Sequence, residues 1–186
     1  QCILDWRDAD DFSYLGGAES GYYRALDPPY RAKNGDFDVL EELLFVKGVM
    51  PEVFARVRPY LTLHGSGKVN VNTASETVLT SLGLAAPLAA RVAAYRKGKD
   101  GLTGTQDDGV FMSPSGVVRD LESQGPLARE DKDLVESLIL SGSLAVHSTH
   151  FAIESEARLK HRKQMLKAYC IFERYERIKH WQEWYA

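Results

Sequence analysis

The sequence predicts an α+β protein in which helices and antiparallel strands occupy separate parts of the chain. Up to about residue 140, apolar side chains recur at helical spacing between capping residues and glycines. From Ala145 the spacing changes to period 2, and the final segments are rich in aromatic residues. The 186 residues have the apolar content of a globular protein and are enough for a stable core. We therefore expect helices first and an antiparallel meander last.

Residues 5–35 are acidic and turn-rich, and they show no sustained period. We expect an ordered loop here because the segment carries five large aromatic anchors: Trp6, Tyr14, Tyr22, Tyr23 and Tyr30. A helix should follow at about residues 37–47, where Asp38 and Glu41 are spaced as a capping box. A shorter helix should begin at Pro51 and end near Pro59.

Four more helices are expected in the centre of the chain. Thr73 and Glu76 form a second capping box, and Pro87 is placed to begin the next helix. Two further short helices should follow, one after Ser113 and one at about residues 128–140.

The last quarter reads as three strands, "HFAIESEARL", "MLKAYCIFERY" and "KHWQEWY", with "KHRK" turning the chain between the first two. Their aromatic side chains exceed what one small sheet can cover, which predicts a docking surface for a partner helix or strand. The aromatic residues concerned are Tyr169, Phe172, Trp181, Trp184 and Tyr185.

The net charge of −3 hides a difference between the two ends of the chain. Residues 5–42 hold ten acidic and four basic residues, whereas residues 158–179 hold eight basic and two acidic ones. A metal ion or a basic partner suits the first segment, and an acidic partner suits the second.

Several classes of function are excluded by missing motifs. "HGSGKVN" lacks the spacing of a phosphate-binding P-loop, and neither HExxH nor GxSxG occurs. Cys2 and Cys170 match no zinc or redox spacing, although a disulfide between them is compatible with an oxidising compartment.

No apolar run is long enough to span a bilayer. The opening residues are typical of the end of a helix, so we expect a fragment without its targeting segment.

Carboxylates are the strongest chemical signal. The first acidic loop (residues 8–19) contains Asp8, Asp10 and Glu19, which match positions 1, 3 and 12 of an EF-hand although its interior does not. The second acidic loop (residues 100–108) contains Asp100, Asp107 and Asp108 among glycines and threonines. Calcium is the expected ligand of either loop, and solvated turn carboxylates are the alternative.

The stretch "VNVNTASETVLTSLGL" is typical of the first half of a helix-hairpin-helix, a unit often used to grip the DNA backbone. Its hairpin "LGLAAPLA" has only Gly83 where two glycines are needed to meet a phosphate. Four basic residues follow, but the second acidic loop comes directly after them: Arg91, Arg96, Lys97 and Lys99. We expect a packing module without nucleic acid, and a DNA-binding protein of the competence-receptor type is the alternative.

Taken in order, the segments resemble the K-type minor pseudopilins of the bacterial type II secretion system. The resemblance runs through "LDWRDADD", "GGAESGYY", "PPYRAKNGDFDVLEELLFVKGVMPEVF", "PYLTL", "VNVNTASETVL" and "FMSPSGVVRDL" to the strand-rich end. It implies a large α-helical inserted domain, SAM-like and containing a helix-hairpin-helix, over residues 1–144. Residues 145–186 would be the C-terminal strands of a pilin-like sheet, without the pilin helix and first strands.

The same resemblance implies a structural, non-enzymatic role. Such proteins cap the periplasmic pseudopilus with the I- and J-type minor pseudopilins and bind calcium in the inserted domain. The expected partners are therefore these pseudopilins, with exported substrates as further candidates. The expected location is the periplasmic face of the inner membrane, with membrane contact only through an N-terminal helix outside this sequence.

Overall fold

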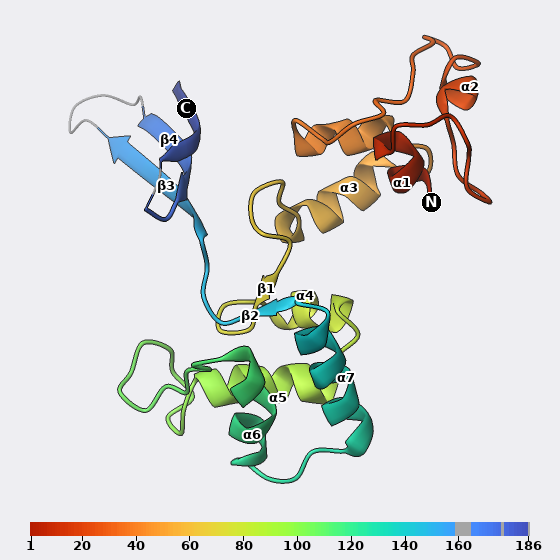
Figure 1. Ribbon diagram of the computed structural model, residues 1–186. Coiled ribbons are helices and arrows are strands. Elements are labelled where there is room, and N and C mark those ends of the chain that lie inside the picture. The colour runs from red at the N-terminus through yellow and green to blue at the C-terminus, as the bar shows by residue number, and fades with distance from the viewer. Residues whose placement is uncertain (159–164, 176, 186) are drawn as a thin grey trace. The chain divides into compact units, whose positions relative to one another are not determined.

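The computed structural model describes residues 1–158, 165–175 and 177–185. The chain divides into two compact units, residues 1–63 and residues 64–186 (Figure 1). Each unit has its own buried apolar cluster, so each is described by itself.

The first unit contains short helices joined by ordered loops. They are α1 (Cys2–Arg7), α2 (Ser20–Tyr23), η1 (Leu40–Phe45), α3 (Pro51–Val57) and η2 (Arg58–Tyr60). Its core gathers around Trp6 and Tyr23, whose ring centroids lie 5.1 Å apart in an edge-to-face arrangement. The Tyr23 hydroxyl accepts a hydrogen bond from the Lys47 amide at 3.1 Å, which satisfies the polar end of this fully buried side chain.

Three predictions for the first unit were wrong in detail: the helix at residues 37–47, its capping box at Asp38 and Glu41, and two of the aromatic anchors. Residues 40–45 form a 3₁₀ helix, shorter than the α-helix expected at residues 37–47. The residue that caps it is Glu42, which accepts from the amides of Asp38 and Val39 and also pairs with Lys33 at 2.8 Å. Of the five expected aromatic anchors, Tyr14 and Tyr22 are exposed rather than buried.

The second unit begins with a helical part (Figure 1). Its four α-helices contribute side chains to one buried apolar cluster. These helices are α4 (Glu76–Ser81), α5 (Ala86–Arg96), α6 (Val117–Glu122) and α7 (Arg129–Leu140), with a 3₁₀ turn η3 (Pro114–Gly116) before α6. Leu79, Leu88 and Leu121 are among its most buried side chains. The starts predicted near Pro87, Ser113 and residue 128 are confirmed.

The capping box predicted at Thr73 and Glu76 was wrong. Helix α4 is capped by Ser75, whose hydroxyl accepts from the Val78 amide at 3.3 Å. Thr73 belongs instead to the preceding turn, since its amide donates to the Asn70 carbonyl.

Two asparagines of the "VNVN" segment connect distant parts of the second unit. Strand β1 (Val69–Asn70) pairs in parallel with β2 (Leu144–Ala145), so the chain enters and leaves the helical part side by side (Figure 1). The Asn72 side chain donates to the carbonyls of Phe111 and Val146 at 2.9 and 2.7 Å and accepts from the Phe111 amide. Asn70 donates to the Ser148 hydroxyl at 2.9 Å. These two side chains therefore link the segment around β1 to the backbone at Phe111 and to the residues that follow β2.

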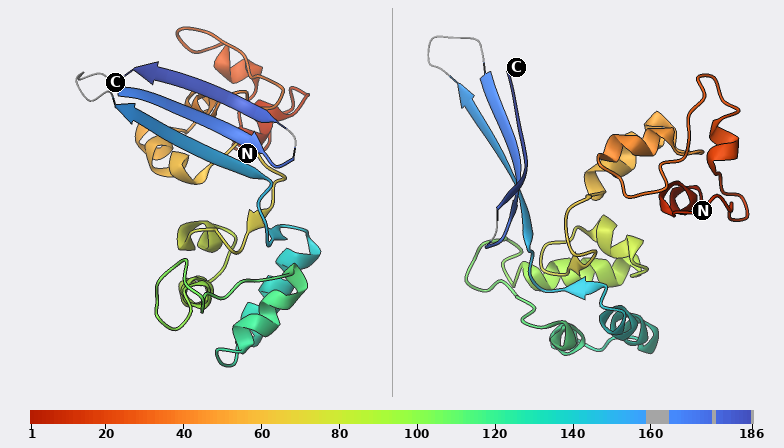
Figure 2. Two further views of the ribbon diagram at one scale, coloured as in Figure 1. Left: turned by 90° about the vertical axis from the view of Figure 1, so that its left-hand side faces the viewer. Right: turned by 45° about the horizontal axis from the view of Figure 1, so that its top comes forward.

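The C-terminal strands form a three-stranded antiparallel sheet of order β3-β4-β5, as predicted (Figure 2). The strands are β3 (His150–Arg158), β4 (Met165–Glu173) and β5 (Ile178–Tyr185). The turn predicted at "KHRK" lies outside the described residues. Cys2 and Cys170 are both free cysteines, and Cys170 is buried in β4.

The strand register divides the aromatic residues between the two faces of this sheet. Directly paired residues share a face, and Ile153, Cys170 and Trp181 are paired across all three strands. We call this side the apolar face, and its exposed large side chains are Phe151, Ile153, Phe172, Ile178, Trp181 and Tyr185. Tyr169 and Trp184 lie on the opposite, more polar face, paired with Glu154 and Lys167.

The architecture is therefore α+β with segregated helices and strands, as predicted. The expected boundary at residues 144/145 falls within strand β2, and the compact units divide at residues 63/64. The pairing of β1 with β2 joins residues on both sides of the expected boundary. Within the described part of the chain, no helix has the length and apolar character needed to cross a bilayer.

Candidate metal centre

Three carboxylates of the first unit converge around the start of the first acidic loop. Asp5 lies on α1, Asp8 follows its last residue, and Glu19 directly precedes α2. Each offers one carboxylate oxygen, and these oxygens lie within 4.8 Å of one another. The side chains of Asp5 and Glu19 are 0% and 6% exposed. The fold thus brings three acids together in a place largely closed to solvent.

Two of the three carboxylates of this cluster, Asp8 and Glu19, have buried oxygens without the partners that buried charges require. Both oxygens of Glu19 and Oδ1 of Asp8 are buried without a hydrogen-bond partner. Burial raises the pKa of Glu19, and the nearby charges of Asp5 and Asp8 raise it further. Burial, followed by the charges of Asp10 and Asp5, raises the pKa of Asp8 as well. Negative charge is therefore concentrated here without compensation.

These features fit a hard divalent cation. The cluster supplies only oxygen donors, which calcium and magnesium prefer, whereas zinc favours nitrogen and sulfur. No salt bridge to Lys or Arg involves Asp5, Asp8 or Glu19 within the described ranges. Burying several carboxylates without a cation raises the free energy of the folded state, and a bound cation would offset this increase. We therefore take these three residues as the candidate calcium ligands.

Two members of this carboxylate cluster were among the residues predicted from the sequence, but the third was not. Asp8 and Glu19 belong to it, whereas the Asp10 carboxylate accepts from the Phe12 amide at 2.8 Å and caps a turn. The third member of the cluster is Asp5, which precedes the EF-hand pattern counted from Asp8 and is therefore not included in it. The available signal was that Asp5 lies three residues before Asp8, about one helical turn, so that a helix ending between them brings the two side chains close together.

The carboxylates of the second acidic loop bond to their own loop. Asp107 accepts from the amides of Lys99 and Asp100 at 2.6 and 3.2 Å, and Asp108 accepts from the Gly104 amide at 2.6 Å. The amide of Lys99, followed by the Thr105 hydroxyl, lowers the pKa of Asp107. Asp100 accepts from the Leu102 amide at 2.8 Å. These are satisfied turn acids, unlike the carboxylates of the first loop.

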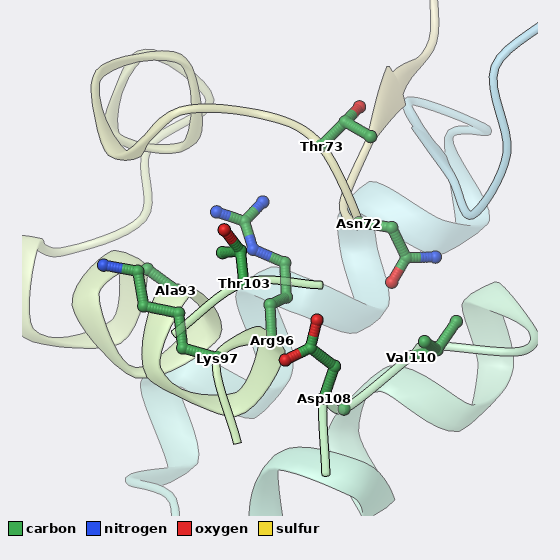
Figure 3. A pocket seen from close by; sticks show the side chains of 9 residues that line it. Asn72, Thr73, Ala93, Arg96, Lys97, Thr103, Asp108 and Val110 are labelled. Carbon is green, nitrogen blue, oxygen red and sulfur yellow. The ribbon is translucent and has the colours of Figure 1, made fainter. Parts of the chain in front are cut away.

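A pocket of about 400 Å³ lies between this second loop and the end of α5. Figure 3 shows that Arg96 and Lys97 line it together with Asp108, so its wall carries charges of both signs. The Arg96 guanidinium donates to the carbonyls of Val71 and Ala74 at 3.2 and 2.7 Å. Arg96 therefore holds the turn that follows β1. Because its wall carries charges of both signs, the pocket does not offer a uniformly positive surface to a polyanion.

In the hairpin between α4 and α5, the polar groups also form their hydrogen bonds within the protein. The Gly83 and Leu84 amides donate to the carbonyls of Thr80 and Leu79, so they are not directed at an external phosphate. Arg91 donates to the carbonyls of Leu121, Gly125 and Pro126, which places it at the end of α6. Two of the four basic residues considered for DNA binding are thus used in packing.

A glycine next to the carboxylate cluster provides a steric test of this site. A Cβ added at Gly17 would lie 2.0 Å from Asp5 Oδ2, so Gly17→Ala must displace that carboxylate. We expect calcium affinity to fall at least tenfold, about 1.4 kcal/mol, in isothermal titration. Gly21→Ala is the matched control, because its Cβ would meet nothing within 4 Å. Equal affinities for the two variants would place the metal elsewhere.

Comparisons with known proteins agree with the resemblance seen in the sequence. Residues 1–66 match the family described as Type II secretion system (T2SS), protein K. Type II secretion system protein K of Aeromonas hydrophila is 42% identical over 76 residues, covering 38% of this chain and 22% of that protein. The protein of the same name from Pectobacterium carotovorum subsp. carotovorum is 34% identical over 76 residues, covering 40% and 23%.

A longer alignment and a solved structure extend the similarity beyond the first unit. Type II secretion system protein K of Pseudomonas aeruginosa is 29% identical over 166 residues, covering 88% of this chain and 44% of that protein. The chain therefore spans less than half the length of these relatives.

The fold is shared with a chain of the GspK-GspI-GspJ complex from enterotoxigenic Escherichia coli, with a TM-score of 0.65 and 20% identity. That match covers 100% of this chain and 60% of the other. The resemblance predicted from the sequence is thus confirmed: the chain is similar to type II secretion system protein K, and the family match covers its first 66 residues.

Proposed function

We propose that the protein containing this chain is a structural minor pseudopilin of the K type. It assembles with I- and J-type minor pseudopilins at the tip of the type II secretion pseudopilus, on the periplasmic face of the inner membrane. Its role is to form contacts between proteins rather than to catalyse a reaction. Calcium bound by Asp5, Asp8 and Glu19 stabilises its first unit.

The apolar face of the sheet is the observation that carries the assembly role. Six large apolar side chains from all three strands are exposed on one side of a three-stranded sheet. Exposed apolar patches of this kind mark protein interaction sites, and aromatic side chains such as Trp181 and Tyr185 are frequent binding hot spots. A helix or strand of a partner pseudopilin would cover this face and remove it from water.

The comparisons support the choice of partners. The solved chain that shares this fold belongs to a complex of GspK, GspI and GspJ. The relatives in three other bacteria bear the name of a secretion-system component. An assembly with I- and J-type proteins accounts both for this kinship and for the exposed apolar face.

The assembly role is tested by mixing the chain with soluble I- and J-type pseudopilins and measuring co-elution in size exclusion, with affinity from titration. We expect a complex at tens of micromolar that weakens at least tenfold in Trp181→Ser with Tyr185→Ser, because removing a hot spot costs 2 kcal/mol or more. Trp184→Ser is the matched control, since Trp184 is an exposed tryptophan on the opposite face of the same strand.

Two results would contradict this role. Three separate elution peaks for the wild-type chain would show that this region does not make the contact. Equal weakening by the Trp184 and the Trp181/Tyr185 substitutions would show that the apolar face is not the surface that binds.

A further inference from the structure

The first acidic loop carries large apolar side chains that the first unit does not bury. We call Phe12, Tyr14 and Leu15 the apolar tip; they are 83%, 51% and 100% exposed. Burying a side chain of this size gains about 1.5–3 kcal/mol, so leaving three of them in water forgoes considerable stabilisation. Three such residues within four positions are a feature of interaction surfaces.

The tip is held in a fixed shape by contacts at its base. The Tyr14 amide and the Ser13 hydroxyl both donate to the Asp5 carboxylate, at 3.2 and 3.1 Å. The Lys47 ammonium donates to the Gly17 carbonyl at 3.1 Å. The tip is therefore ordered before it meets a partner, which reduces the entropy lost on binding.

The metal centre and the apolar tip share a residue. Asp5 belongs to the carboxylate cluster and also accepts the two hydrogen bonds that fix Ser13 and Tyr14. Asp8 and Glu19 lie on either side of the tip in the sequence. Without a cation, three neighbouring carboxylates repel one another at the base of the loop. A divalent cation would join both ends of the loop and keep the tip in place.

The charge around the tip indicates what binds it. Asp10 and Asp11 directly precede Phe12, and residues 8–19 contain no Lys or Arg. Together with Asp5, Asp8 and Glu19 they make five carboxylates, so one bound divalent cation leaves three negative charges. Such a surface repels an anionic membrane or a nucleic acid and attracts a cationic partner.

We propose that the apolar tip docks onto an apolar surface bordered by Lys or Arg side chains on a protein partner, and that the metal controls this docking. The metal control rests on the proposed calcium site, whereas the docking rests on the exposed side chains and their charge. This surface lies in the first unit, whereas the assembly surface is the sheet of the second unit.

A designed peptide provides the probe. It is a fluorescent helical peptide with leucine on one face and lysine on both sides of that face, and its counterpart carries glutamate instead of lysine. Anisotropy is measured with the full chain at 150 mM salt, in calcium and in EDTA. We expect the lysine peptide to bind at least tenfold more tightly than the glutamate peptide, and tenfold more tightly in calcium than in EDTA.

Variants identify the surface. Phe12→Ser with Leu15→Ser should weaken binding of the lysine peptide at least tenfold. The matched control, Met112→Ser with Leu140→Ser, removes two exposed apolar side chains of the second unit and should leave binding unchanged. Asp10→Asn with Asp11→Asn should weaken binding of the lysine peptide, because it removes two of the negative charges next to Phe12.

The outcomes separate this inference from the proposed calcium site. Equal binding by the tip variant and its control would overturn the docking surface, as would equal affinity for the two peptides. Binding to vesicles of anionic lipid instead of the lysine peptide would identify a membrane surface and overturn the protein partner. If calcium binds but peptide affinity is the same in EDTA, the metal control is wrong and the calcium site stands. If calcium does not bind, the metal control is wrong together with the site, and the tip variants still decide the docking.

Discussion

Saturating calcium is expected to raise the melting temperature of the metal-stripped chain by about 5–10 °C. A ligand held only by the folded state at 100 times its dissociation constant adds about 2.7 kcal/mol. Each kcal/mol corresponds to about 2–4 °C for a chain of this length. Glu19→Gln should abolish the rise, because Glu19 has two buried oxygens without a partner that are available to the metal.

The metal-free form of the same variant gives an independent measurement. Glu19→Gln removes a buried charge that neighbouring carboxylates repel, so without metal it should melt no lower than the wild type. Asp107→Asn with Asp108→Asn is the control for the second acidic loop and should keep the calcium response. Loss of the response in that control but not in Glu19→Gln would assign the metal to the second loop. No response in the wild type would make both loops ordinary turns.

The calcium response should also depend on pH. Because the pKa values of Asp8 and Glu19 are raised in the folded state, the folded metal-free chain holds these protons more tightly than the unfolded chain. Their contribution to stability is therefore fully present below the ordinary carboxyl pKa of about 4 and is lost as pH rises through the raised values. Calcium requires the ionised form, so its stabilising effect should grow from pH 4 to pH 7.

Asn72→Ala is expected to destabilise the second unit by about 2–4 kcal/mol. The substitution removes three hydrogen bonds and leaves the amide and carbonyl of Phe111 and the carbonyl of Val146 without this partner. Urea unfolding should show a lower midpoint at an unchanged slope. Thr77→Ala, at an exposed position of α4, is the control and should change stability by about 0.5 kcal/mol or less. A loss below about 1 kcal/mol for Asn72→Ala would mean that other contacts hold these segments together.

The sequence predicted most reliably those elements whose signals are local. Helix α5 begins next to Pro87 as expected, and the period-2 pattern after Ala145 corresponds to three antiparallel strands. Capping was less predictable, because Ser75 and Thr73 are chemically similar and the preceding turn decides which of them reaches an amide. The 3₁₀ helix at residues 40–45 was also missed, since its geometry depends on how Glu42 is shared between two amides and Lys33.

The candidate site shows a different limit. Acidic residues at suitable spacing occur in both loops, and spacing alone does not reveal which oxygens already have partners. In the second loop, main-chain amides reach Asp107 and Asp108, whereas no such donor reaches Glu19. Asp5 was missed because it belongs to a helix rather than to the loop that the template covers. The decisive information is the position of backbone donors, which only the folded chain provides.

The parallel pairing of β1 with β2 makes residues 71–143 a helical segment, here called the helical cassette, that can be exchanged as one piece. Because the chain enters this segment at Asn70 and leaves it at Leu144 in adjacent paired strands, the two cut points lie close together. Adjacent ends of this kind allow a segment to be excised, exchanged or circularly permuted without moving what it interrupts. The size and surface of the helical cassette can therefore change while the paired strands at its two ends keep their positions.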